Sequence, residues 1–183
     1  MRKVTLLGDS IRQIGYGPVV AERLNGRLEV FQPQDNGRFA KYTLRGLFDW
    51  RDGIAGSEVI HWNNGLWDTS DIFGDGLFTS PDEYISDMLR IARLLLKVTP
   101  HVIFATTTPV RDDNPHNHNS DIEKYNAMIV PELKKMGIAI NDLYTALSPK
   151  RYEYIGEDKV HLTQEGVEVC AGLVIQAIEN MLP

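Results

Sequence analysis

The sequence has a single cysteine, Cys170, so no disulfide bond can form within the chain. It also lacks clusters of Lys and Arg, because 19 basic residues are outnumbered by 25 acidic ones and the formal net charge is −6. Phosphate neutralisation needs a clustered excess of positive charge, so we expect no nucleic-acid partner. No apolar run approaches the roughly 18 residues that cross a bilayer, and we therefore expect no membrane-spanning segment.

The length and composition of the chain are those of an ordinary globular domain. Hydrophobic residues make up 43% of the 183 residues and charged residues 24%, which disfavours disordered and coiled-coil classes. We expect a single domain over residues 1–183. The chain enters an apolar segment at residues 3–7 without the features of a signal peptide, which favours a cytoplasmic protein. An exported protein with its signal peptide removed would begin in the same way.

Apolar runs and helical patterns alternate from one end of the chain to the other. This alternation is typical of βαβ units and predicts an α/β fold with a parallel sheet. Several of the runs are continuously apolar, as in strands that are covered on both faces. We expect five strands, over residues 3–7, 28–31, 58–62, 102–105 and 138–140.

Three helices have recognisable starts. Ser80 precedes Pro-Asp-Glu, so its hydroxyl can cap a helix while Glu83 reaches back to it. The same pattern at Ser120 predicts a second start, and Pro131 predicts a kink or a break in that helix. Thr163 is expected to cap the last helix.

Three long polar segments cover residues 63–79, 106–119 and 148–162. Long loops in a compact α/β domain are usually functional. Ligands of an open parallel sheet bind outside the carboxyl ends of its strands. We therefore expect functional residues in these three segments and at the end of the first strand.

A Gly-Asp-Ser block at residues 8–10 directly follows the first predicted strand. A serine at the carboxyl end of a strand lies at the rim of the ligand crevice, which suits a nucleophile. One alternative is that Ser10 only caps a following helix. Another is a phosphate-binding loop, but the G-x-G-x-x-G spacing that it requires is absent and we reject it.

Near the other end, residues 158–163 read Asp-Lys-Val-His-Leu-Thr. A serine hydroxyl needs a general base within hydrogen-bond reach, and an imidazole base needs a carboxylate to fix its tautomer. The spacing can place Asp158 and His161 on one side of a turn. The alternative is that both are ordinary polar residues ahead of the helix that Thr163 caps.

Together the two blocks resemble the SGNH, or GDSL-like, hydrolases, whose hallmarks are a Gly-Asp-Ser block near the N-terminus and a closing Asp-x-x-His. Three further stretches are similar to ones common in that family: residues 107–109, 125–126 and 141–144. The resemblance extends over the whole chain and implies a three-layer, flavodoxin-like fold with a five-stranded parallel sheet flanked by helices. The G-x-S-x-G elbow of the larger α/β-hydrolases is absent.

The resemblance implies a cofactor-free reaction through a catalytic triad. Ser10 would be the nucleophile, His161 the general base and then acid, and Asp158 the carboxylate that orients the imidazole. The family also uses an oxyanion hole formed by the N–H of the nucleophile, the N–H of a glycine and the side chain of an asparagine.

The oxyanion hole is where the sequence departs from the family pattern. Gly37 is the candidate glycine, with a plain turn glycine as the alternative. The register that matches strand length aligns the Gly-x-Asn-Asp block with residues 65–68, which puts Trp67 where the asparagine is expected. Asn63 and Asn64 lie just upstream, and we favour Asn63 because it immediately follows the strand.

Candidates for substrate binding are Asp9, Trp67, Thr108 and Arg111. The Trp67 ring could form a wall for a sugar ring or an acyl chain, and Arg111 could contact an anionic group or lie on the surface. His116 and His118 stand among aspartates, but no second pair of ligands is visible, so we expect a solvated loop and no metal.

The sequence thus predicts a serine esterase acting on a short-chain or acetyl ester, with a small-molecule or carbohydrate ester as its substrate. Lysophospholipid and thioester substrates are alternatives within the same chemistry. The alternative of another class is a binding module that kept the fold while the altered third block lost its oxyanion support. Turnover of a small acetyl ester that depends on Ser10 separates the two.

Overall fold

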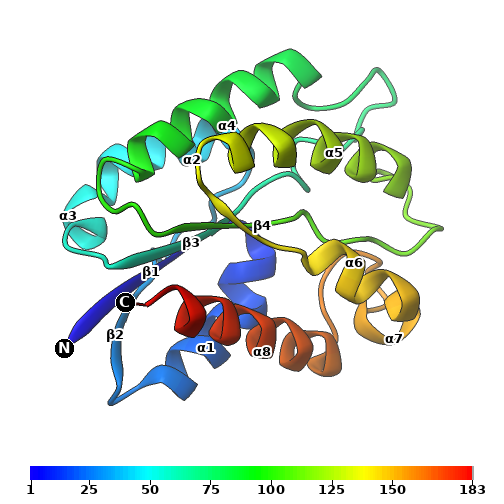
Figure 1. The fold of residues 1–183 in the computed structure, drawn as a ribbon. Helices are drawn as coiled ribbons and strands as arrows, with labels where there is room; N and C mark the ends of the chain where they lie inside the picture. The colour runs from blue at the N-terminus through cyan, green and yellow to red at the C-terminus, as the bar shows by residue number, and fades with distance from the viewer. Residues whose placement is uncertain (183) are drawn as a thin grey trace.

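The structure, a computed structural model, describes residues 1–182. Its strands form one parallel sheet in the order β2-β1-β3-β4-β5 (Figure 1). The strands are β1 (Arg2–Leu7), β2 (Leu28–Phe31), β3 (Val59–Asn63), β4 (Val102–Ala105) and β5 (Ala139–Asn141). The predicted α/β fold with a five-stranded parallel sheet is confirmed.

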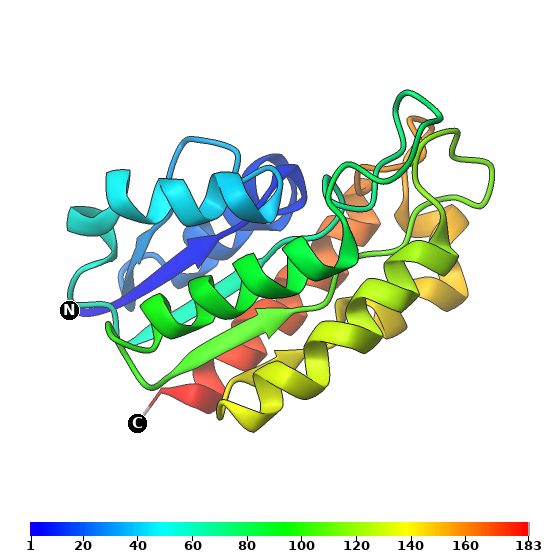
Figure 2. The ribbon, with the colours of Figure 1, turned by 90° about the horizontal axis from the view of Figure 1, so that it is seen from above.

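Helices cover both faces of the sheet and give the molecule three layers (Figures 1 and 2). One face carries α1 (Gly17–Leu24) and α8 (Gln164–Met181). The other face carries α2 (Ala40–Asp49), α3 (Arg51–Ile54), α4 (Pro81–Leu95) and α5 (Asn119–Lys135). Short helical segments complete the chain: η1 (Ile11–Tyr16), α6 (Leu143–Leu147), η2 (Ser148–Lys150) and α7 (Arg151–Tyr154).

The central strand β3 shows why both layers form. All five of its residues are buried, and successive side chains point to opposite faces. Trp62 packs against Phe104 on the side of α4, with ring centroids 5.0 Å apart. His61 faces the other layer, where it meets the edge of Tyr16 at 5.7 Å. A strand that is buried on both faces therefore needs a helical layer on each side.

The helix boundaries agree with two of the three predicted starts. The Glu83 carboxylate accepts hydrogen bonds from the hydroxyl of Ser80 at 2.8 Å and from its N–H at 3.4 Å, and α4 begins one residue after Ser80. Thr163 caps α8 and accepts a hydrogen bond from the N–H of Gly166 at 3.1 Å.

The predicted start at Ser120 is wrong. The helix α5 begins at Asn119 with His118 at its N-cap, so Ser120 lies inside the first turn. Asn119 instead fixes the chain ahead of the helix, because its Oδ1 accepts a hydrogen bond from the N–H of Val110 at 3.0 Å. The predicted break at Pro131 is also absent, since α5 continues through it to Lys135.

The long loops gather at the carboxyl end of the sheet (Figure 2). The loop after β3 and the loop after β4 are joined by an antiparallel bridge between Ser70 and Asn117, and the N–H of Asp71 donates to the carbonyl of His116 at 2.7 Å. Within residues 1–182, no helix combines the length and the apolar character needed to traverse a bilayer.

Candidate active site

Ser10 lies in the turn between β1 and η1, at the carboxyl end of the sheet. The carbonyl of Asp9 accepts hydrogen bonds from the N–H groups of Arg12 at 3.2 Å and Gln13 at 2.9 Å, and its Oδ1 accepts from the N–H of Ile11 at 3.0 Å. These bonds use the N–H groups that follow Ser10. The N–H of Ser10 itself has no acceptor among residues 1–182, so it can serve a ligand.

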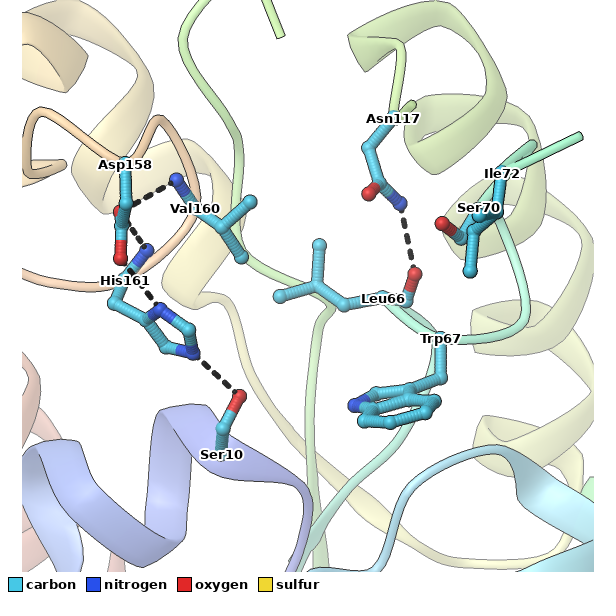
Figure 3. A pocket seen from close by; sticks show the side chains of 9 residues that line it. All are labelled: Ser10, Leu66, Trp67, Ser70, Ile72, Asn117, Asp158, Val160 and His161. Atoms are coloured by element: carbon cyan, nitrogen blue, oxygen red, sulfur yellow. Dashed lines mark hydrogen bonds and ion pairs between the residues drawn. The ribbon is translucent and has the colours of Figure 1, made fainter. Parts of the chain in front are cut away.

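His161 reaches Ser10 from the loop between α7 and α8 (Figure 3). Its Nε2 lies 2.9 Å from Ser10 Oγ, and its Nδ1 lies 2.7 Å from Asp158 Oδ2. The structure thus brings together three predicted residues that are separated by up to 151 positions in the chain. An imidazole between a carboxylate and a serine hydroxyl is the arrangement that activates the hydroxyl as a nucleophile.

A tight turn fixes the geometry of this loop. Asp158 Oδ1 accepts hydrogen bonds from the N–H groups of Val160 at 3.1 Å and His161 at 2.9 Å. The N–H of Gly156 donates to the carbonyl of His161 at 2.7 Å, which closes the turn. Although partial burial acts to raise it, the hydrogen bonds from Val160 and His161 hold the pKa of Asp158 below its ordinary value. The carboxylate is therefore kept ionised while it orients the ring.

Asp9, predicted from the sequence to bind substrate, is enclosed beneath the nucleophile and lines no cavity beside Ser10. Its side chain is buried, and Oδ1 accepts a hydrogen bond from Asn63 Nδ2 at 3.0 Å. Burial raises its pKa. Asn63 Oδ1 in turn accepts from the hydroxyl of Tyr16 at 2.9 Å. Gly8 lies so close that a Cβ there would meet Asn63 Oδ1 at 1.9 Å, which explains the glycine.

Arg12 is a supporting residue that the sequence analysis missed. Its buried guanidinium donates to the carbonyls of Gly8 at 3.0 Å, Pro33 at 2.7 Å and Asp35 at 2.7 Å. It therefore ties the nucleophile turn to the loop after β2. The only available signal was an arginine on an apolar helical segment. Its three acceptors are backbone carbonyls, which cannot be recognised from residue type.

The remaining oxyanion candidates differ in whether they have an N–H that is not already hydrogen-bonded. The N–H of Gly37 donates to the carbonyl of Gly8 at 2.9 Å, so it is occupied in this structure. Asn64 donates from Nδ2 to the carbonyl of Arg38 at 2.9 Å and accepts from Trp62 Nε1 at 2.7 Å. Asn63 and Asn64 each retain one amide proton without an acceptor among residues 1–182. Asn63 is 5% exposed and Asn64 is fully buried, and neither lines the cavity beside Ser10.

A cavity of about 270 Å³ opens beside the serine and the histidine (Figure 3). Most of the surface that lines the cavity is apolar. The lining includes the predicted residue Trp67, which is 37% exposed. The lining residues are Ser10, Leu66, Trp67, Ser70, Ile72, Asn117, Asp158, Val160 and His161. Ser70 and Asn117, on the wall opposite the triad, were not identified from the sequence.

Two other predicted substrate-binding residues do not line this cavity. Arg111 donates from Nε to the carbonyl of Ile155 at 2.9 Å, and its N–H donates to the carbonyl of Lys159 at 3.1 Å. It therefore holds the loop that carries Asp158 and His161. Thr108 is buried away from the cavity, with 3% of its surface exposed.

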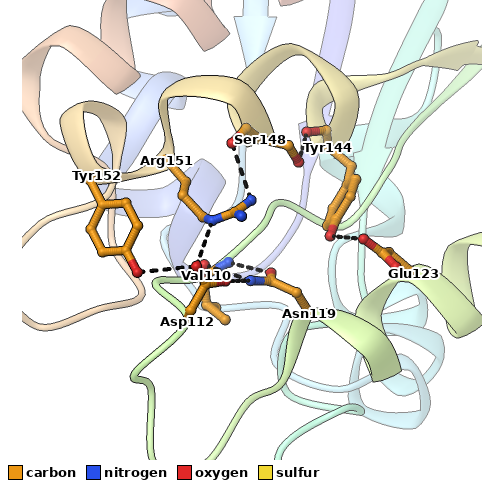
Figure 4. A network of polar contacts seen from close by, with 8 residues as sticks. All are labelled: Val110, Asp112, Asn119, Glu123, Tyr144, Ser148, Arg151 and Tyr152. Atoms are coloured by element: carbon orange, nitrogen blue, oxygen red, sulfur yellow. Dashed lines mark hydrogen bonds and ion pairs between the residues drawn. The ribbon is translucent and has the colours of Figure 1, made fainter.

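A polar network supports the same loop from behind (Figure 4). Asp112 accepts hydrogen bonds from Arg151 Nε at 3.2 Å, from the hydroxyl of Tyr152 at 3.1 Å and from Asn119 Nδ2 at 3.0 Å. These contacts join the loop after β4 to α7. The segment that leads into the Asp158 turn is thereby fixed to the start of α5.

No metal centre is evident in the part of the chain that the structure describes. Residues 1–182 contain no group of three or more His, Cys, Asp or Glu side chains placed to hold an ion. His116 and His118 are exposed, and His118 is the N-cap of α5.

Comparison with known proteins identifies the fold. No protein-family model matches the chain, and no curated protein matches it. A lipase/acylhydrolase from Enterococcus faecalis matches with a TM-score of 0.82 and 18% identity, over 100% of this chain and 98% of that one. An acetylxylan esterase from Geobacillus stearothermophilus matches with a TM-score of 0.77 and 16% identity, over 97% and 94%.

A GDSL-like lipase from Bacteroides thetaiotaomicron matches with a TM-score of 0.75 and 21% identity, over 98% of this chain and 88% of that one. At such identities the likeness concerns the fold. The chain therefore has the fold of GDSL-like lipases and acetyl xylan esterases, and the predicted resemblance to the SGNH hydrolases is confirmed at that level.

Proposed function

We propose that the chain is a serine ester hydrolase in which Ser10 is the nucleophile, His161 the general base and Asp158 the orienting carboxylate. The observation that carries this proposal is the continuous hydrogen-bonded path from Ser10 Oγ through both ring nitrogens of His161 to Asp158, with distances of 2.9 and 2.7 Å. This path opens into a cavity large enough for a small ester.

The reaction proceeds in two acyl transfers. His161 Nε2 takes the proton of Ser10 Oγ as the oxygen attacks the ester carbonyl carbon, and the imidazolium then gives that proton to the departing alcohol oxygen. Water attacks the acyl-serine in the second step, again with His161 as the base, and Ser10 is released with the carboxylic acid. Asp158 stabilises the imidazolium in both steps, and its lowered pKa suits this role.

Two donors for the oxyanion follow from the contacts around Ser10. The first is the N–H of Ser10, which has no acceptor among residues 1–182. The second is the remaining amide proton of Asn63, whose direction is fixed because Tyr16 holds its oxygen and Asp9 holds its other N–H. A donor that is already oriented stabilises the developing charge without reorganisation.

The cavity favours a short acyl group on an alcohol of modest size. Its volume of about 270 Å³ is small for a long lipid chain, and Trp67 offers an aromatic face to a ring. Two matching structures are described as acetyl xylan esterases, which supports an acetyl ester on a carbohydrate as the substrate class.

A labelling experiment tests the proposal. Wild-type protein should hydrolyse 4-nitrophenyl acetate and react with a fluorophosphonate probe at Ser10, and Ser10→Ala should lose both properties while keeping its melting temperature. The matched control is Ser120→Ala, which removes an exposed hydroxyl on α5 and should leave both unchanged. Esterase activity that survives Ser10→Ala, or a label on another serine, would refute the assignment. Ligand binding without any turnover would favour a binding module.

A further inference from the structure

The wall of the cavity that faces the triad carries two polar oxygens in apolar surroundings. Asn117 and Ser70 come from the loops after β4 and β3, and the antiparallel bridge between them places the two residues side by side. Leu66, Trp67 and Val160 supply the apolar surface between this wall and His161 (Figure 3). Neither Asn117 Oδ1 nor the hydroxyl of Ser70 has a hydrogen-bond partner among residues 1–182.

The orientation of the Asn117 amide is determined by its neighbour. Nδ2 lies 2.8 Å from the carbonyl oxygen of Leu66, and only an N–H can donate to a carbonyl. Oδ1 is therefore the atom left on the open side, and Figure 3 shows it facing the space between Asn117 and Val160. An acceptor that is fixed in this way and lacks a partner requires a donor from a ligand or from water.

The backbone of Asn117 is also held firmly. Its N–H donates to Asn114 Oδ1 at 2.8 Å, and the residue is buried apart from the side that faces the cavity. Little conformational entropy is lost when a ligand binds to a group that is already ordered. Asn117 thus has the properties of a recognition group rather than of a mobile surface amide.

The proposed chemistry determines which half of an ester meets this wall. His161 Nε2 must give its proton to the leaving alcohol oxygen, so the alcohol lies on the side of the histidine. The cavity borders His161, Asp158 and Val160 on that side. The alcohol half therefore occupies the space across which Asn117 faces the triad.

Resting on the ester hydrolysis proposed above, we infer that Asn117 Oδ1, assisted by the hydroxyl of Ser70, accepts a hydrogen bond from a hydroxyl group of the alcohol half of the substrate. The preferred substrates are then esters of polyhydroxylated alcohols, with the ring against Trp67 and one free hydroxyl directed at Asn117. A site that binds a hydroxyl rejects an analogue that lacks it, because the bound analogue would cover the acceptor and leave it without a partner.

Two kinds of acetate ester with the same ring size test the inference. The three positional monoacetates of methyl β-xylopyranoside carry free hydroxyls, and cyclohexyl acetate carries none. For wild type, kcat/KM on the best sugar acetate should exceed that on cyclohexyl acetate by about tenfold or more. Asn117→Leu should reduce this ratio by about tenfold, and Ser70→Ala should reduce it by a smaller factor.

Thr69→Val is the matched structural control. Thr69 donates to the carbonyl of Gly65 at 3.0 Å and accepts a longer hydrogen bond from Asn117 Nδ2 at 3.4 Å, but it does not line the cavity. The Leu66 carbonyl, at 2.8 Å, still orients the Asn117 amide when the Thr69 hydroxyl is removed. Its substitution should leave the ratio unchanged even where both rates fall. If Asn117→Leu lowers both rates by the same factor, Asn117 only maintains the turn and the inference is overturned.

Two further outcomes keep the inference separate from the proposed function. If Asn117→Leu does not fold, monodeoxy analogues of the best sugar acetate are assayed on wild type, where loss of one hydroxyl should lower kcat/KM about tenfold. Ser10-dependent hydrolysis with no preference for hydroxylated esters overturns this inference alone. Absence of any Ser10-dependent hydrolysis overturns the proposed function and this inference with it.

Discussion

Ser10 and His161 lie within hydrogen-bonding distance of each other, but the segments that carry them are held in different ways. Beneath Ser10, the residues Asp9 and Arg12 are each only 1% exposed, and their side chains bind groups from several elements. At the other end, the side chains of Asp158 and His161 are 54% and 39% exposed, and the bonds that shape their turn are local.

The difference follows from the position of each segment in the fold. The nucleophile turn continues a central strand, so its polar groups are enclosed by the sheet and need partners inside the protein. The Asp158 turn crosses the surface ahead of α8 and keeps its polar groups close to water. Changes to the buried side chains beneath Ser10 should therefore alter stability together with rate, whereas changes to the exposed side chains at the histidine end should alter mainly the rate.

Of the substitutions that compare the two ends, Asp158→Asn is expected to have the largest effect. The amide oxygen can still accept from the backbone of the turn, but an NH₂ group would face His161 Nδ1 and favour the wrong tautomer. We expect kcat for 4-nitrophenyl acetate to fall by about 10³- to 10⁴-fold, with a melting temperature close to that of wild type. Steady-state kinetics and calorimetry measure the two.

Glu157→Gln is the control for this comparison, because it removes a neighbouring exposed carboxylate that contacts neither His161 nor Ser10. It should leave kcat unchanged. If kcat of Asp158→Asn falls by less than tenfold, or if its melting temperature falls strongly, the histidine end does not differ from the serine end in the way proposed.

The contrast also explains how far the sequence could predict this molecule. The strands and the placement of Ser10 and His161 at one edge follow from apolar runs and chain order, which are local properties. Trp67 was recognised because a tryptophan in a polar loop is unusual. Arg12 was missed because its partners are carbonyl groups, which every residue carries.

The wrong or missing assignments of Arg111 and Asn117 have the same cause, which is that their partners are distant in the chain. Arg111 was taken for a possible substrate contact, but its partners are the carbonyls of Ile155 and Lys159, which the fold brings near from 44 and 48 positions away. Asn117 was overlooked among the polar residues of its loop. Its importance depends on the position of Leu66 in another loop, which no pattern within residues 106–119 encodes.

At the serine end, Asn63→Ala should lower kcat by about 10²-fold with little change in KM, since an oxyanion contact is made chiefly in the transition state. It should also lower the melting temperature, because Asp9 and Tyr16 both lose a buried partner. Asn64→Ala is the control, with kcat within about twofold of wild type despite the loss of the partner of Trp62. A loss of kcat in Asn64→Ala alone would transfer the donor role to Asn64.

The smallest effect is expected from Asp68→Asn, which tests how a buried carboxylate in the loop after β3 affects stability. Asp68 accepts the N–H of Ala40 at the start of α2 with both oxygens at 3.1 Å, and burial raises its pKa to about 7. The unfolded chain releases this proton near pH 4, so folding takes up a proton between roughly pH 4 and 7. The stability that Asp68 provides is thus complete below pH 4 and is lost as the pH rises through 7.

An asparagine at this position does not titrate. The melting temperature of Asp68→Asn minus that of wild type should therefore increase by a few degrees from pH 5 to pH 8. Differential scanning calorimetry at both pH values measures this change. Asp49→Asn, at the exposed end of the same helix, controls for the loss of one negative charge and should show no such increase. A difference that stays constant with pH would mean that Asp68 is ionised at pH 5 in the folded protein, with its charge stabilised by the N-terminus of α2.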